Sequence, residues 1–114
     1  MEQVLKSLYD LKCDYNKKLE KEGIDFKVLK SAEVNILKDG SLDIDRSVLA
    51  QLDFVAAAVH SHFNMTSKEI TNRICTAIRN PLVDIIFHPT GRLILKRPAS
   101  LVRRKCVPPQ SSAV

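Results

Sequence analysis

Three residues of types that commonly bind metal ions occur at regular intervals in this sequence. Glu33, His60 and His88 are separated by 27 and 28 residues, and each lies at or near the end of a short apolar segment. An interval of this length matches one β-α repeat of a parallel α/β fold, in which functional side chains gather at the carboxyl ends of the strands. We therefore predict that the three side chains converge at one edge of a sheet.

Two imidazoles and a carboxylate form a good ligand set for zinc, manganese or iron. A carboxylate can also bridge two metal ions, which suits the hydrolysis of phosphoesters. Arg92, just beyond His88, is placed to bring a guanidinium to a substrate phosphate. Each residue also has a purely structural interpretation. The two histidines could be half-buried residues at strand ends, the glutamate could simply be solvated, and the arginine could be a surface charge. His62 is either a further ligand or an exposed loop residue. The repetition at three strand ends favours the metal site.

The segments around these residues predict the elements that position them. Residues 26–34, 53–60 and 83–87 are rich in apolar and β-branched side chains and are expected to be strands. A short helix is expected at 45–52. A longer one is expected at 66–79, where the sequence TSKE forms a capping box. Strands that alternate with helices in this way are parallel and joined by helical crossovers.

The N-terminal segment predicts a further helix. Residues 2–22 carry apolar side chains at helical spacing, and Gly23 provides a stop signal. We expect this stripe to pack into the core. Its members are Val4, Leu8, Leu11, Tyr15 and Leu19.

The positive charge of the chain lies entirely at its C-terminal end. The formal net charge is +5, but residues 1–95 contain equal numbers of basic and acidic side chains. The excess comes from Lys96, Arg97, Arg103, Arg104 and Lys105. A basic tail can contact phosphates, but this one also contains Pro108-Pro109 and three serines, which is typical of a solvated, disordered end.

The sequence also limits where the protein resides. It has no apolar run of membrane-spanning length, and its N-terminus lacks the hydrophobic core of a signal peptide. With 114 residues it is long enough for one small domain. We expect a cytoplasmic protein without a membrane partner.

Three segments resemble successive motifs of the PHP (polymerase and histidinol phosphatase) domain. They are KSAEVNILKDGSLDID, LDFVAAAVHSHFNM and NPLVDIIFHPTGRLILKR, which together run from about Phe26 to Arg97. The version that they resemble most is the one attached to bacterial and archaeal family X DNA polymerases. The resemblance implies a distorted (β/α)7 barrel that binds manganese or zinc and hydrolyses phosphoesters, including DNA ends in the full-length parent. It places Glu33, His60 and His88 on metal ligands of the family.

The sequence also departs from this pattern. Ser31, Ala58, His62 and Phe87 replace residues usual in the family, and its opening His-x-His and closing Asp-x-His motifs are absent. We therefore expect a fragment of the barrel in residues 1–97, with about three parallel strands, crossover helices and partial metal occupancy. Residues 98–114 would form the disordered basic tail.

Three functions remain open at this point. The chain is a metal-dependent phosphoesterase fragment that is inactive alone, a non-catalytic interaction or scaffold remnant, or a subunit of a small-molecule phosphatase that a partner chain completes. An interrupted barrel also leaves unpaired strand edges, which favour self-association.

Overall fold

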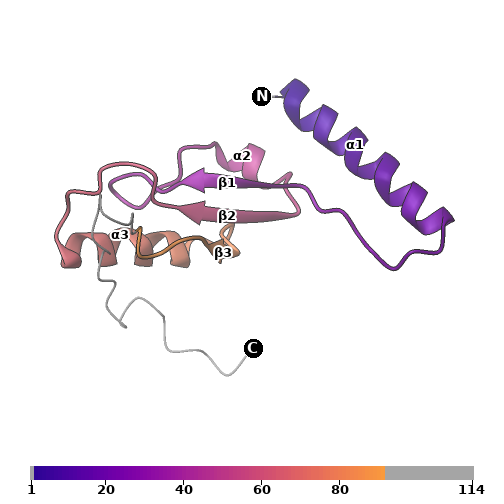
Figure 1. Ribbon diagram of the computed structural model, residues 1–114. Coiled ribbons are helices and arrows are strands. Elements are labelled where there is room, and N and C mark those ends of the chain that lie inside the picture. The colour runs from indigo at the N-terminus through magenta and orange to yellow at the C-terminus, as the bar shows by residue number, and fades with distance from the viewer. Residues whose placement is uncertain (1, 92–114) are drawn as a thin grey trace.

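The computed structural model of this chain describes residues 2–91. Helices and strands alternate along it (Figure 1). Arg92 and the tail of residues 98–114 lie outside the described residues. The elements are α1 (Glu2–Lys21), β1 (Ser31–Asn35), α2 (Arg46–Leu49), β2 (Phe54–Ala58), α3 (Ser67–Arg79) and β3 (Ile85–Ile86).

The three strands form one parallel sheet in the order β1-β2-β3. The predicted α/β class, element order and strand direction are therefore confirmed. The described residues form an open sheet, and a closed barrel is not evident among them. No helix in this part of the chain is both long enough and apolar enough to cross a membrane.

The helix α3 forms where local signals predicted it. The Thr66 side chain accepts a hydrogen bond from the Glu69 N–H at 3.2 Å, and the Glu69 carboxylate accepts one from the Thr66 N–H at 2.7 Å. This is the predicted capping box. The helix then runs alongside the sheet (Figure 1) and buries Ile70, Ile74 and Ala77 against it.

The core lies on one face of the sheet. In a parallel sheet, paired residues place their side chains on the same face, and Val34 pairs with Ala57. Apolar side chains of this face pack against α3 and against Leu49 of α2. The sheet contributes Val34, Ile36, Val55, Ala57 and Val59 to these two clusters.

The opposite face carries the polar residues of β1. Glu33 pairs with Ala56, and Asn35 pairs with Ala58. Ala56 pairs in turn with Ile85 of β3. Both alanines are buried. Their small side chains leave room beside the longer glutamate.

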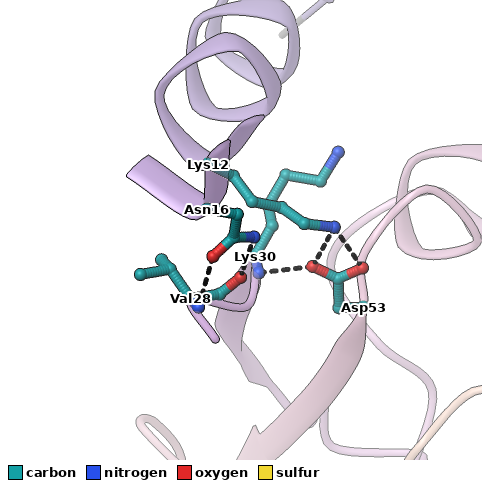
Figure 2. Close-up of polar contacts among 5 residues, drawn as sticks. All are labelled: Lys12, Asn16, Val28, Lys30 and Asp53. Carbon is teal, nitrogen blue, oxygen red and sulfur yellow. Dashed lines mark hydrogen bonds and ion pairs between the residues drawn. The ribbon is translucent and has the colours of Figure 1, made fainter. Parts of the chain in front are cut away.

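The first strand is shorter than predicted. Residues 26–30 precede β1 instead of belonging to it, and Phe26 and Leu29 are 67% and 51% exposed. The cause is a side chain of α1. Asn16 accepts a hydrogen bond from the Val28 N–H at 2.7 Å and donates one to the Val28 carbonyl at 3.0 Å, as Figure 2 shows. Both polar groups of Val28 are thus satisfied by an amide, so this segment needs no neighbouring strand.

The helix α1 ends as predicted but does not pack as predicted. The Gly23 N–H bonds to the Glu20 carbonyl and the Ile24 N–H to the Leu19 carbonyl, with Gly23 at φ +69°, which is a Schellman motif. The predicted core stripe is instead mostly exposed, and the buried residue of α1 is Leu5. The exposed members of the stripe are Val4, Leu8, Leu11 and Tyr15.

Polar contacts join α1 to the segments that precede β1 and β2 (Figures 1 and 2). The Lys12 ammonium lies 2.7 Å from Asp53 Oδ2 and 2.8 Å from Oδ1. Asp53 Oδ2 also accepts a hydrogen bond from the Lys30 N–H at 2.6 Å. Lys12 and Asn16 make these bonds, and the apolar stripe lies beside them, where Leu8, Leu11 and Tyr15 line an open groove and stay exposed. This exposure overturns the prediction that the stripe is core.

Candidate metal centre

Glu33, His60 and His88 converge as their positions after three strands predict. The Nε2 atoms of His60 and His88 each lie 2.8 Å from the same carboxylate oxygen, Oε1 of Glu33. One potential ligand atom from each residue lies within 4.8 Å of the other two. The imidazole rings are tilted by 52°, with centroids 5.4 Å apart. The group is open to solvent, since all three residues are exposed.

The strand register shows that residues at equal intervals in the sequence do not lie side by side in the sheet. Glu33 pairs with Ala56, four residues before His60. Four extended residues span about 13 Å. The chain bends after β2 instead of continuing straight, and the His60 N–H donates to Oδ1 of Asn35 at 3.0 Å. This bend and the length of the glutamate side chain bring the carboxylate and the imidazole together.

His88 occupies an unusual backbone conformation. It follows β3 by two residues and has a φ of +32°, a region that costs a non-glycine residue of order 1–3 kcal/mol. The turn closes through a hydrogen bond from the Gly91 N–H to the His88 carbonyl at 2.9 Å. The chain therefore turns at His88, two residues after β3, and the turn leaves its imidazole against Glu33.

Asn35 contributes to the site although the sequence analysis did not single it out. Besides accepting the bond from His60, it donates through Nδ2 to Ser61 Oγ at 3.2 Å. It lies two residues after Glu33, on the same face of β1. An amide in this position joins β1 to the segment that carries His60. The signal in the sequence was a polar residue two positions after the candidate ligand.

His62 takes the second of its two predicted roles. It is exposed, has a φ of +52° and lies 3.2 Å through Nδ1 from Ser61 Oγ. Among the described residues it is outside the group of potential metal ligands. Arg92, the predicted phosphate contact, lies outside the described residues.

The electrostatics of the group favour an ionised carboxylate. Hydrogen bonds from His60 and then His88 lower the pKa of Glu33 below its ordinary value. The group therefore presents an anionic oxygen and two imidazole nitrogens at neutral pH. This donor set fits a divalent transition metal, because borderline metals accept both nitrogen and oxygen ligands.

Arg73 of α3 is a second residue that the sequence analysis missed. Its guanidinium is buried below the segments that follow β1 and β2. A signal was present in the sequence, because Arg73 lies three residues after Ile70 and four before Ala77, on the stripe that α3 buries.

Comparison with known proteins identifies relatives that are much longer than this chain. No family model matches it. It is 51% identical over 79 residues to the DNA polymerase/3'-5' exonuclease PolX of Bacillus subtilis, an alignment that covers 69% of this chain and 14% of that protein. It is 43% identical over 72 residues to a probable phosphatase of Thermoanaerobacter sp., which covers 60% of this chain and 29% of that protein. A probable phosphatase of Caldanaerobacter subterraneus is 38% identical to this chain over 72 residues. That alignment covers 60% of this chain and 28% of the phosphatase.

Proposed function

We propose that this chain is the part of a PHP-type, metal-dependent phosphoesterase that holds Glu33, His60 and His88. One observation carries the proposal: two imidazole nitrogens share a single carboxylate oxygen, each at 2.8 Å. Residues that are far apart in the sequence thus present three donor atoms to one point. The similarity to a polymerase that is also an exonuclease and to probable phosphatases supports phosphoester chemistry.

The three residues have distinct tasks in this proposal. Glu33 supplies an anionic oxygen, because its histidine neighbours lower its pKa. His60 and His88 supply imidazole nitrogens, and Nε2 can bind a cation only when the ring proton is on Nδ1 instead. Bound zinc or manganese would supply Lewis-acid polarisation of a phosphoryl oxygen. Arg92 would grip the substrate phosphate from the segment that follows His88.

The complete activity belongs to a larger assembly than this chain. The chain spans 14% of the Bacillus polymerase and 29% of the Thermoanaerobacter phosphatase, and its only other histidine is His62. Three ligands hold one ion, whereas a metal cluster needs more carboxylates and imidazoles. We propose that the chain by itself binds about one divalent ion weakly and has negligible phosphoesterase activity. In the full-length parent, the substrates would include DNA ends.

Metal binding to the purified chain tests this proposal. Isothermal titration with zinc and manganese should give about one site per chain, and His60→Ala and His88→Ala should each abolish it. His62→Ala is the matched control, since it removes a neighbouring exposed imidazole that lies outside the group. It should leave the affinity unchanged.

Hydrolysis of p-nitrophenyl phosphate with added manganese or zinc tests the second part. The chain alone should show no turnover above that of His88→Ala. Two or three tightly bound ions per chain, or turnover that both histidine variants lose, would contradict the proposed partial site. Absence of any metal binding that depends on His60 would contradict the proposal as a whole.

One observation favours a second candidate function, that of an interaction module. The apolar stripe of α1 is exposed, and the described residues provide no strand to the outer edges of β1 and β3. Exposed apolar patches and open strand edges both favour association with other chains. Self-association would bury these surfaces without any chemistry at Glu33.

A further inference from the structure

The buried cation of α3 requires an explanation beyond helix packing. Arg73 is 1% exposed and has the largest fully buried side chain among residues 2–91. None of the ion pairs among the described residues involves it, and burial lowers the pKa of its guanidinium. A buried charge without a carboxylate partner costs desolvation free energy that an aliphatic side chain would not. The hydrogen bonds of the guanidinium indicate a role that offsets this cost.

The guanidinium joins two separate segments by hydrogen bonds to main-chain carbonyls. Toward the segment after β1, Nε donates to Leu37 at 2.9 Å and to Ile36 at 3.2 Å, and Nη2 also donates to Ile36. Toward the segment after β2, Nη1 donates to Ser61 at 3.0 Å and to His62 at 3.1 Å. A planar fork of donors can hold both segments at a fixed separation, which a single ammonium cannot.

These two segments adjoin two of the three proposed ligands. Ile36 follows Glu33 by three residues, and Ser61 follows His60 directly. Asn35 already joins β1 to the His60 N–H, so this junction is held by Arg73 as well as by the amide. The hydrogen bonds of Arg73 do not reach the turn that carries His88.

We infer that Arg73 is a positioning residue that sets the separation of Glu33 and His60. The inference rests on the proposed function, in which these two residues bind a metal ion. Residues behind a metal ligand that fix its orientation typically change metal affinity by about 10–100-fold when they are replaced.

Three variants separate positioning from general stability. Arg73→Lys keeps the charge but loses the fork, Arg73→Met keeps the length but loses every donor, and Ile74→Ala is the matched control. Ile74 is the adjacent buried residue of α3, and its truncation opens a cavity without removing a hydrogen bond. Zinc affinity is measured by titration at a temperature where circular dichroism shows each variant folded. Both Arg73 variants should bind about tenfold or more weakly, whereas Ile74→Ala should bind within about twofold of the unchanged chain.

A measurement on the unchanged chain avoids any problem of folding. If Arg73 strengthens zinc binding, zinc must strengthen the Arg73 contacts by the same factor, because the coupling between two sites is reciprocal. Hydrogen exchange at the Arg73 Nε–H, followed by nuclear magnetic resonance, should therefore slow by about tenfold on zinc addition. An exchange rate that zinc leaves unchanged would overturn the inference.

A second readout needs no metal and so separates this inference from the proposed function. In Arg73→Lys, the imidazole signals of His60 should move, and by more than those of His88, which contacts the same Glu33 oxygen but lies on a turn that Arg73 does not bond. If the unchanged chain fails to bind zinc, the proposed function fails, and the His60 signals still decide whether Arg73 positions that residue. Unchanged His60 signals, or an equal loss of zinc affinity in Ile74→Ala, would reduce Arg73 to a contributor to stability.

Discussion

Gly40→Ala should be among the most destabilising small substitutions in this chain. Gly40 lies in the turn after β1 with a φ of +90°. A Cβ at this position would lie 2.4 Å from Thr76 Cβ and 2.9 Å from the Arg73 carbonyl oxygen. Both atoms belong to the body of α3 and not to the end of a flexible side chain, so they cannot move aside. The alanine variant must therefore either move the turn away from α3 or distort the backbone of the turn and of the helix.

The magnitude follows from two separate costs. A left-handed backbone costs an L-residue about 1–2 kcal/mol. An extra methyl group forced against packed neighbours costs about 1–3 kcal/mol more. Gly40→Ala should therefore lower the free energy of unfolding by about 2–5 kcal/mol, a large part of the roughly 5–15 kcal/mol that stabilises a native domain.

Gly23→Ala is the matched control because it isolates the first cost. Gly23 also has a positive φ, of +69°, but a Cβ there would have no heavy atom within 4 Å. It should lose only about 1–2 kcal/mol. Urea unfolding followed by circular dichroism measures both variants, and the slope of the transition should stay constant. Equal losses in the two variants would refute the argument that contact between the turn and α3 determines the effect.

Three further predictions concern the attachment of α1, the start of α3 and the exposed stripe. Asp53→Asn removes a carboxylate whose pKa is lowered, first by Lys12 and then by a backbone N–H. The stability that this carboxylate contributes is present above its unfolded pKa of about 3.9 and is lost as the pH falls through the lower folded value. The urea midpoints of the two proteins should therefore differ at neutral pH and converge in acid. Thr66→Ala should lower the free energy of unfolding by about 1 kcal/mol, because it removes a helix cap, whereas Thr66→Ser should retain most of it. Sedimentation velocity should show concentration-dependent self-association, which Leu11→Lys weakens by placing a charge in the exposed stripe.

Each of these predictions has a result that contradicts it. Midpoints that differ by the same amount from neutral to acid pH would show that the Asp53 carboxylate is not linked to stability. Equal stability of the alanine and serine variants at Thr66 would show that the hydroxyl is not a cap. A monomer at every concentration would argue against the exposed stripe and strand edges as association surfaces.

The sequence by itself determined the elements whose signals are local. The capping box of α3, the stop at Gly23 and the alternation of strands with helices each depend on residues close together in the chain, so they were predicted close to where they form. The meeting of Glu33, His60 and His88 was also predictable, because parallel strands joined by crossovers must end at the same edge of a sheet. Their roles as metal ligands stay predictions.

Only the tertiary structure decided which face of each element is buried and at what height each residue lies. The stripe of α1 suggested core, but Asn16 and Lys12 bond to Val28 and Asp53, residues that are distant in the sequence, and the stripe stays exposed. The strand register, and not the interval along the chain, sets Glu33 level with Ala56. The helical stripe of α3 includes Arg73, but the carbonyl groups that surround its guanidinium belong to two segments more than ten positions away, so only the tertiary structure identifies its partners.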